Sequence, residues 1–265
     1  MEQPCVDSSK WYEDFFTGLA LEGWRRANSP EVTEEEAAFL LDRLDPPPGG
    51  RLLDAPCGHG RLALALARRG YAVHGVDQCA PYITEAQATA QAEDLPASFR
   101  RGDMRDPPQG AGQDSLSGAF DGAYCMGNSF GGLDAAGSGE FLRVVGDALR
   151  PGALFVLDSE VLAETLLPHL EHRVWMTLGD MMVLTEHQYH PLEGRLDSTY
   201  TFIQGTRRES AQAHHWIFSI AQVRAMLSAA GMQVLELLAG PEGAPYSLGD
   251  PRVLIVAQRV EVSGR

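Results

Sequence analysis

A turn with two glycines offers the clearest chemistry in this sequence. The segment LLDAPCGHG (52–60) is typical of a short buried strand ending at Asp54, a tight turn and the start of a helix. Gly58 and Gly60 have no Cβ, so a ligand can lie directly against the backbone there. Free N–H groups at the helix start would then face that ligand. The turn therefore predicts a site for a nucleoside-containing cofactor.

A second carboxylate follows at a distance that suits such a cofactor. Asp77 ends the next predicted strand, 17 residues after Gly60 (77 − 60). A carboxylate in this place can accept hydrogen bonds from both ribose hydroxyls. The span from Gly58 to Ala63 also fits the loose dinucleotide pattern G-x-G-x-x-G/A. These features alone therefore leave an NAD-type oxidoreductase open as an alternative.

Three features favour S-adenosylmethionine over a dinucleotide. Asp54 would repel pyrophosphate, whereas a sulfonium ion and an amino group both gain from a nearby carboxylate. Asp103, in GDM (102–104), follows the third predicted strand and can accept a hydrogen bond from an adenine amino group. The run FDGAYCMGNSFG (120–131) ends the fourth strand in small and polar residues, which would border the cofactor at the carboxyl edge of the sheet.

Strand and helix patterns alternate along the part of the chain that carries these residues. Strands are predicted at 51–54, 71–77, 97–103, 120–126 and 153–158, and helices at 34–44, 61–69, 81–92 and 140–149. Strands separated by helices of this length pair in parallel through right-handed crossovers. Thr33 with Glu36 predicts a capping box for helix 34–44, and Ser219 with Gln222 predicts one for a later helix that ends at Gly231.

The pattern changes between residues 161 and 216. Four strand-like runs, separated by turn signals, predict a small antiparallel sheet inserted on the substrate side: 173–178, 181–190, 195–204 and 211–217. Two closing strands, 232–239 and 252–259, then return to the main domain. Residues 1–30 are rich in aromatic side chains and predict a helical arm. This arm either packs on the domain or forms a lid over a ligand.

These motifs, in this order, resemble those of the class I S-adenosylmethionine-dependent methyltransferases. LLDAPCGHGRLALALARRG (52–70) is similar to their glycine-rich motif, and the later motifs are matched by VHGVDQC (73–79), GDMRD (102–106), FDGAYCMGNSFGG (120–132) and LRPGALFVLD (149–158). The resemblance implies an α/β, Rossmann-like fold over 31–160 and 217–265. Its seven-stranded sheet would have an antiparallel last strand and helices on both faces. One departure is Pro56, which stands where the family often has glycine.

The resemblance also implies roles for the loop residues. Contacts with the cofactor are implied for the turn residues Asp54, Ala55, Pro56, Cys57, Gly58 and Gly60, for Asp77 and Gln78 at the ribose, for Asp103 and Met104 at adenine, and for Met126, Gly127 and Asn128 near the sulfonium. Tyr12 and Trp24 of the arm are candidates to close over the cofactor, with core packing as the alternative. Cys57 is expected to pack, because nothing beside it in sequence would lower the pKa of its thiol.

The inserted sheet resembles the cap of small-molecule N- and O-methyltransferases. This implies in-line methyl transfer to an amine or hydroxyl, with the acceptor held opposite the sulfonium and water excluded. His214 and His215 are the candidate catalytic bases, and since strand neighbours face opposite sides only one can face the crevice; we favour His215. Glu186, His187 and His190 could suggest a metal site, but positions three apart on a strand also face opposite sides, so no metal is predicted.

Composition and charge restrict the expected partners. The chain has 21 Lys and Arg against 36 Asp and Glu, a formal net charge of −15, which repels a phosphate backbone and argues against nucleic acid. No apolar stretch reaches the length of a membrane span, and no signal-peptide pattern opens the chain. Four cysteines without zinc or disulfide spacing, Cys5, Cys57, Cys79 and Cys125, indicate reduced thiols.

These observations predict a cytoplasmic protein with a small-molecule acceptor and no membrane contact. A homodimer is compatible with the sequence but is not required by it. Three other functions stay open at this point: a cofactor-binding or scaffold protein without catalysis, an NAD-dependent oxidoreductase, and a methyltransferase that acts on proteins.

Overall fold

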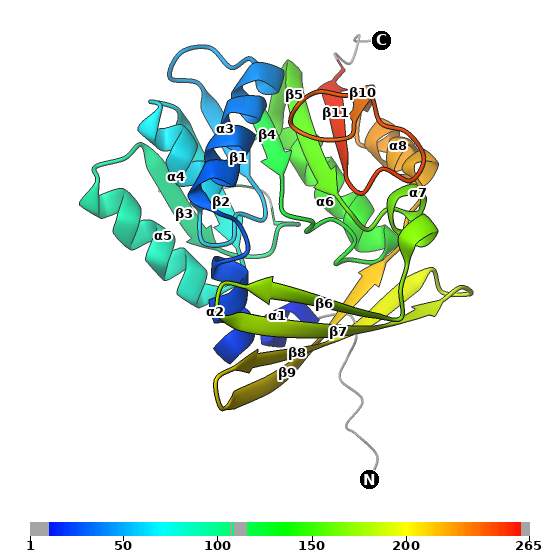
Figure 1. Ribbon diagram of the computed structural model, residues 1–265. Helices are drawn as coiled ribbons and strands as arrows, with labels where there is room; N and C mark the ends of the chain where they lie inside the picture. Colours follow the sequence, from blue (N-terminus) through cyan, green and yellow to red (C-terminus); the bar gives the residue numbers. More distant parts are fainter. Residues whose placement is uncertain (1–10, 107, 109–115, 261–265) are drawn as a thin grey trace.

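Two sheets of different size make up the frame of the molecule (Figure 1). The structure is a computed structural model, and it describes residues 11–106, 108 and 116–260. The first ten residues of the predicted arm, including Cys5, lie outside the described residues. A seven-stranded sheet carries helices on its faces, and a four-stranded sheet lies across one of its ends.

The larger sheet has the predicted mixed topology. Its strands are β1 (Arg51–Asp54), β2 (Ala72–Asp77), β3 (Ala97–Arg101), β4 (Phe120–Cys125), β5 (Leu149–Ser159), β10 (Met232–Leu238) and β11 (Val253–Arg259). They lie in the order β10-β11-β5-β4-β1-β2-β3. Strands β5, β4, β1, β2 and β3 pair in parallel, whereas β11 is antiparallel to both β5 and β10. The predicted seven-stranded sheet with an antiparallel last strand is confirmed.

Helices cover both faces of this sheet, as predicted. On one face lie α3 (Pro30–Leu44), α4 (Arg61–Arg68) and α5 (Ala80–Ala92), which share one buried core with the strands. On the other lie α6 (Ala135–Ala148) and α8 (Ile220–Ala229), with a second core. Two short elements, α7 (Ala163–Leu166) and the 3₁₀ helix η2 (Leu167–His169), lead to the smaller sheet. Burial of both faces accounts for the nearly continuous apolar strand sequences.

The start of α3 differs from its prediction. The helix begins at Pro30, with the Ser29 hydroxyl accepting a backbone N–H of the first turn at 3.3 Å. Proline at the first helical position fixes a helical φ and has no N–H to satisfy, so the helix starts one turn earlier. The predicted capping box of Thr33 and Glu36 is therefore wrong. The box predicted at Ser219 is confirmed.

The smaller sheet, called the cap from here on, is antiparallel in the order β6-β7-β8-β9. Its strands are β6 (Arg173–Leu178), β7 (Met181–His190), β8 (Arg195–Gln204) and β9 (Arg207–Trp216). Three match the predicted ranges, and β9 begins four residues earlier than expected (211 − 207). The division of the chain into an arm (1–30), a core (31–160 and 217–265) and a cap (161–216) stays a prediction.

The arm packs on the cap. Helices α1 (Trp11–Phe15) and α2 (Gly18–Arg25) share a buried core with the inner face of the cap sheet, in which Phe15 and Leu19 meet Val183 and Phe202. Ring centroids of Phe15 and Tyr200 lie 5.4 Å apart, edge to face. The arm and the cap therefore form a third packed unit, separate from the two cores of the larger sheet.

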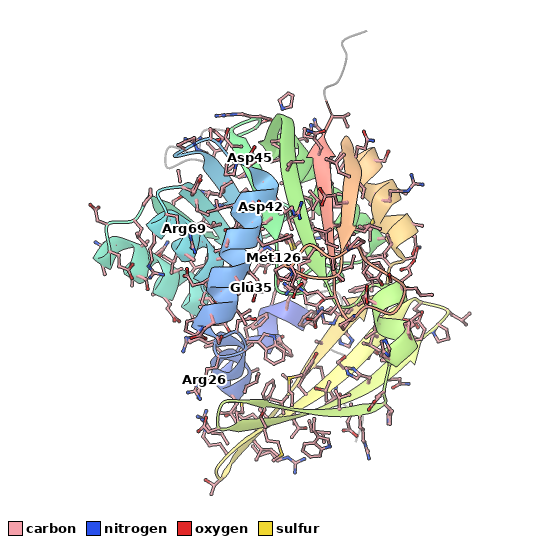
Figure 2. All side chains as sticks on the ribbon, turned by 45° about the horizontal axis from the view of Figure 1, so that its top comes forward. Arg26, Glu35, Asp42, Asp45, Arg69 and Met126 are labelled. Carbon is pink, nitrogen blue, oxygen red and sulfur yellow. The ribbon has the colours of Figure 1, made fainter. Side chains whose placement is uncertain are left out.

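Helix α3 has one side exposed to solvent and one side facing the interior of the molecule. Glu35 and Asp42 lie on the exposed side of this helix, whereas Met126 lies inside, just after the end of β4 (Figure 2). The carboxyl ends of the parallel strands thus meet between the large sheet and the cap. Within the described residues, no helix is both long and apolar enough to span a bilayer.

Candidate active site

A cavity of about 490 Å³ lies where the carboxyl ends of the parallel strands meet the cap and the arm. Its volume falls in the range of roughly 300–1,000 Å³ that is usual for small-molecule sites. Most of the predicted cofactor residues line its wall: Tyr12, Trp24, Asp54, Pro56, Cys57, Gly58, Asp77, Gln78, Asp103, Met104, Met126, Gly127 and Asn128. Ala55 and Gly60 belong to the same turn but are absent from the wall.

The two glycines of the turn meet different needs. Gly58 has φ +55°, and no atom lies within 4 Å of the place a Cβ would take, so its backbone is open to the cavity. Gly60 has φ +78°, and a Cβ there would come within 2.9 Å of the Phe99 ring. Gly127, after β4, is open like Gly58, with φ +74°. Gly58 and Gly127 therefore leave room for a ligand, whereas Gly60 permits close packing.

Asp77 ties the glycine turn to the end of β2. One carboxylate oxygen accepts the N–H of Gly58 and the other accepts the N–H of Cys79, both at 2.8 Å. Burial raises the pKa of this carboxyl, and the two backbone hydrogen bonds counteract part of that rise. Each oxygen keeps a lone pair, so the ribose contact stays available. That contact stays a prediction.

Asp103 is already engaged by a neighbouring side chain. The Arg105 guanidinium donates to its two oxygens at 2.9 and 2.5 Å, and Gln78 donates its amide N–H at 3.2 Å. The hydrogen bonds to Asp103 raise the pKa of Arg105. An adenine amino group would thus meet a carboxylate whose charge is largely balanced, so we expect a weaker contact than at Asp77.

Asp54 brings a buried carboxylate to the floor of the cavity. Its side chain is 3% exposed, and burial raises its pKa well above the usual range. The neighbouring Tyr124 hydroxyl and Arg61 act in the opposite direction. A positively charged ligand would favour the ionised form of this carboxyl. This agrees with the expectation that Asp54 faces a sulfonium ion and an amino group.

A buried ionic network that the sequence did not reveal lines the same wall. Arg252, just before β11, donates to both oxygens of Asp158 at 2.7 and 3.0 Å and to Glu36 at 2.5 Å. Arg61 pairs with the other Glu36 oxygen at 2.6 Å. Asp158 also accepts the N–H of Gly127 at 2.9 Å. The network therefore joins α3, α4 and β5 to the loop after β4.

A sequence signal for part of this network exists. Glu36 is followed by the apolar run AAFLL, so it sits at the edge of a buried helix face, and Asp158 ends a buried strand just as Asp54 does. Both carboxylates are 2% exposed. Charged residues rarely become buried unless they are paired, so their partners had to be sought elsewhere in the chain. Nothing local in the sequence pointed to Arg252.

The inner face of the cap forms the other end of the cavity. The cap residues that line it are Met176, Leu178, Tyr200, Ala213 and His215. His215 lies beside the Trp11 ring, with centroids 5.2 Å apart. Burial away from water lowers the pKa of His215 to about 4, and the charges of His214 and His187 contribute to this shift. The ring is therefore neutral at pH 7. His214 is not in this wall; its Nδ1 lies 2.6 Å from an Asp197 oxygen.

For Tyr12 and Trp24 of the arm, the sequence left two alternatives: closing over the cofactor or packing in the core. Their surroundings in the structure have features of both. Each lines the cavity, and each also packs against the arm–cap core. Trp24 stands edge to face with Tyr200, with centroids 5.5 Å apart. The aromatic arm is thus at once packing and cavity wall. Contact of these two residues with the cofactor stays a prediction.

The cysteines and the cap histidines have ordinary structural surroundings. Burial raises the pKa of Cys57 well above normal, so its thiol is protonated and packs. His187 bonds with Ser198 through Nδ1 at 2.9 Å, whereas His190 bonds with Asp197. In the ranges that the structure describes, no group of three or more His, Cys, Asp or Glu side chains could hold a metal ion.

Comparison with known proteins agrees with this geometry. Residues 52–152 match a family described as "Methyltransferase domain". A 23S rRNA (uracil(1939)-C(5))-methyltransferase of Shewanella baltica is 36% identical over 75 residues, which is 28% of this chain and 17% of that protein. The chain therefore spans under a fifth of the length of this relative. A local match of this kind bears on the cofactor domain and leaves the acceptor open.

Solved structures are similar over nearly the whole chain. The CcbJ methyltransferase of Streptomyces caelestis has a TM-score of 0.77 and 19% identity, covering 97% of this chain and 100% of that one. CalS10, an amino pentose methyltransferase from Micromonospora echinaspora, has a TM-score of 0.68 and 19% identity, covering 92% and 98%. Sequence identities this low are evidence for a shared fold only.

Four features therefore lead to one assignment: the open glycines, the carboxylates at the ends of β1 and β2, the order of the strands and the matched family. Residues 52–152 carry a methyltransferase domain, and the fold of the chain is that of solved S-adenosylmethionine-dependent methyltransferases.

Proposed function

We propose that this protein transfers a methyl group from S-adenosylmethionine to an amine or hydroxyl of a small molecule. The observation that carries the proposal is the shared cavity: loops after β1, β2, β3 and β4 form one end of it, and the aromatic arm and cap form the other. One shared space for two ligands is what in-line transfer needs, because both reactants must be held close together.

The residues of the cofactor end suit the chemical groups of S-adenosylmethionine. Gly58 and Gly127 leave room beside the backbone, Asp77 has free lone pairs for the ribose, and Asp54 offers negative charge. Bound there, the cofactor supplies a methyl group on a sulfonium, which is a good leaving group. The protein then has to orient the acceptor and keep the site dry. A dedicated base can be dispensable for such a transfer.

His215 is the cap residue that we assign to the acceptor. A neutral imidazole can accept a hydrogen bond from an acceptor N–H or O–H and so orient its lone pair. The low pKa of His215 keeps it neutral over the physiological range. His214, the other candidate, is held by Asp197 away from the cavity wall, so we give it a supporting role at most.

A small acceptor is favoured over a macromolecular one. The relative from Shewanella baltica is named for action on rRNA, so the charge of −15 alone does not exclude nucleic acid. The acceptor end here is walled by Trp11, Phe15 and Tyr200, and the whole cavity, about 490 Å³, has the size of a small-ligand site. The neighbour named as an amino pentose methyltransferase supports the same choice.

Calorimetric titration tests the proposal directly. We expect S-adenosylmethionine and S-adenosylhomocysteine to bind with micromolar affinity and NADH to show no heat. Release of S-adenosylhomocysteine is then followed with a panel of small amines and phenols as acceptors. Binding of NADH instead, or binding of neither sulfur ligand, would reject the proposal. Tight cofactor binding with no turnover on any acceptor would favour a scaffold role.

A further inference from the structure

One carboxylate in the cavity wall is used by none of the roles described so far. Glu160 follows directly after β5, at the carboxyl edge of the large sheet, and lines the cavity. Its backbone N–H donates to the Asn128 side chain at 2.9 Å. Asn128 itself has φ +62°, a left-handed conformation that asparagine tolerates. The loop after β4 thus fixes the position of Glu160.

The carboxylate of Glu160 is open to the cavity. Among the described residues, no side chain forms a hydrogen bond or ion pair with it. Arg252 is the positive charge that lowers the pKa of Glu160, but its N–H groups donate to Asp158 and Glu36. Glu160 is therefore not a member of the buried network, although it lies beside it.

The cavity as a whole has an excess of negative charge. Its wall contains six carboxylates and two guanidinium groups: Glu36, Asp54, Asp77, Asp103, Asp158 and Glu160 against Arg61 and Arg252. Arg105, which is not part of the wall, balances the charge of Asp103. Both arginines of the wall are paired with Glu36, and Arg252 also with Asp158. S-adenosylmethionine brings two positive groups and one carboxylate, so it balances only part of this excess. A second cation fits the remaining charge.

The Glu160 residue is exposed, yet its surroundings at the cavity wall make its carboxylate a better proton acceptor than an isolated glutamate. Loss of water raises its pKa, the charges of Asp158 and Glu36 raise it further, and Arg252 opposes them. Glu160 in turn contributes to raising the pKa of Tyr200 to about 12, although burial is the main cause. Glu160 and the cap aromatic Tyr200 line the same cavity, so both are available to one ligand.

The rest of the acceptor end is aromatic. Trp11, Tyr12, Phe15 and Tyr200 all line the cavity, and their rings form one contiguous cluster. The faces of aromatic rings attract a positively charged ammonium group, and a neutral hydroxyl has no charge for this attraction. A carboxylate and aromatic rings in one pocket are thus two independent features that favour the same chemical class of ligand.

We propose that the acceptor is a protonated aliphatic amine and that Glu160 binds its ammonium group and takes one proton from it. This inference rests on the proposed function and narrows its acceptor from amine or hydroxyl to amine. A hydroxyl acceptor would gain no ion pair with Glu160. It would also need a stronger base than the neutral His215 to lose its proton.

The step balances in atoms and charge. The Glu160 carboxylate removes H⁺ from R–NH₃⁺, which leaves R–NH₂ with a lone pair. A new N–CH₃ bond forms from that lone pair as the S–CH₃ bond breaks, and its electron pair stays on sulfur. The products are R–NH₂⁺–CH₃ and neutral S-adenosylhomocysteine. The proton on Glu160 then passes to solvent when the cavity opens.

Binding of a matched amine and alcohol tests the inference without knowledge of the natural acceptor. The protein is saturated with S-adenosylhomocysteine and titrated with cyclohexylamine or cyclohexanol, followed by ligand-observed NMR. We expect cyclohexylammonium to bind at least about ten-fold tighter than cyclohexanol. In Glu160→Gln that preference should disappear, while the affinity for cyclohexanol stays the same.

Two controls separate the possible causes. Glu171→Gln removes one exposed carboxylate that does not line the cavity, and it should keep the preference for the amine. In the wild type, the affinity for cyclohexylammonium should fall as the pH is lowered through the raised pKa of Glu160, because the protonated carboxyl no longer attracts a cation. This fall should be absent in Glu160→Gln.

The results distinguish this inference from the function on which it rests. Equal affinities for the two probes, no binding of the amine, or an amine preference that persists in Glu160→Gln would each overturn it. If S-adenosylhomocysteine still binds in those cases, the proposed methyl transfer stands with another acceptor. If S-adenosylhomocysteine does not bind, the proposed function fails first.

Discussion

At the scale of single residues, Asp77 links the shape of the glycine turn to recognition of the ribose. Its carboxylate accepts the N–H groups of Gly58 and Cys79, and the residue lines the cavity beside these backbone groups. Asp103 differs because its partner Arg105 already supplies a positive charge. The two carboxylates should therefore contribute unequally to cofactor affinity.

We expect Asp77→Ala to weaken binding of S-adenosylhomocysteine by about 2–4 kcal/mol, because two hydrogen bonds to a charged group are lost and the turn is released. Asp103→Ala should cost less, since that carboxylate is shared with Arg105 and Gln78. Calorimetric titration of both variants gives the comparison, with circular dichroism as the check on folding. A greater loss for Asp103→Ala would mean that the adenine end is misassigned.

The two neighbouring histidines give a matched pair on opposite faces of β9. His215→Phe should lower turnover by about ten-fold or more, because one hydrogen bond to the acceptor is lost, while leaving S-adenosylhomocysteine binding intact. His214→Phe should change turnover far less, since His214 lies outside the cavity wall. Initial rates with any acceptor found in the screen decide between them. A larger effect for His214→Phe would reverse our assignment.

A buried histidine away from the cavity gives a pH dependence of stability. His74 is 8% exposed, and loss of water, with Arg100 and Arg51 nearby, lowers its pKa to about 4. Between pH 6.5 and 4 the unfolded chain binds a proton at this position and the folded chain does not, so stability falls as the pH falls. The maximum effect is about 3 kcal/mol.

Urea unfolding of wild type and His74→Gln across this pH range isolates the effect. The difference between their free energies of unfolding should shift in favour of the variant as the pH drops below 6.5. Other groups, including His215, titrate equally in both proteins and cancel in the comparison. A difference that does not change with pH would show that His74 is not held neutral by the fold.

At the scale of elements, the arm depends on a few aromatic contacts with the cap. Phe15 is 3% exposed and touches Trp11, Trp24, Tyr200 and Phe202, whereas α1 has only five residues and cannot be stable alone. The position of the arm is therefore a result of packing, and the acceptor end of the cavity depends on it.

Phe15→Ala should destabilise the protein by about 3–5 kcal/mol, as expected for loss of a buried aromatic ring. It should also make the arm more sensitive to limited proteolysis than the rest of the chain. Trp175→Ala is the control, because that side chain is 62% exposed and should change stability by less than about 0.5 kcal/mol. Equal effects of the two variants in thermal denaturation would contradict this account of the arm.

Sequence periodicity was sufficient for most elements, and its failures have identifiable causes. The strands β6, β7 and β8 were predicted in their observed ranges, because alternating side chains and glycine turns mark both ends. The early start of α3 was not predicted, because Pro30 was assigned to the arm and not to the first turn of the helix. Helix α6 starts at Ala135, five residues before its predicted start (140 − 135), because Asp134 caps a stretch whose glycines disguise it.

The candidate site divides in the same way. Residues in the local motifs, such as Gly58 and Asp77, could be predicted because each strand and its following turn are contiguous in sequence. Arg252 could not, since its partner Glu36 is 216 positions away, and only the fold brings the two together. Glu160 was missed because a lone glutamate after a strand carries no pattern.

At the scale of the whole molecule, the negative charge should keep nucleic acid away. With a net charge of −15 and an acidic cavity, we expect no binding of a labelled 20-nucleotide single-stranded RNA in fluorescence anisotropy at low salt, the condition that most favours such contacts. Binding that weakens steeply with added salt would instead support an RNA acceptor like that of the rRNA methyltransferases. The cytoplasmic location stays a prediction, and a homodimer stays compatible with the sequence without being required by it.

The network of Arg61, Glu36, Arg252 and Asp158 has an evolutionary consequence. Removal of one member of a buried ion pair leaves an uncompensated charge and costs roughly 3–5 kcal/mol, whereas joint replacement by apolar residues can be neutral. A single substitution at one of these positions would remove a large part of the free energy of unfolding of an ordinary domain. Among descendants of this gene, the four positions should therefore change together or stay as they are, and their covariation would trace how far this cavity wall has been inherited.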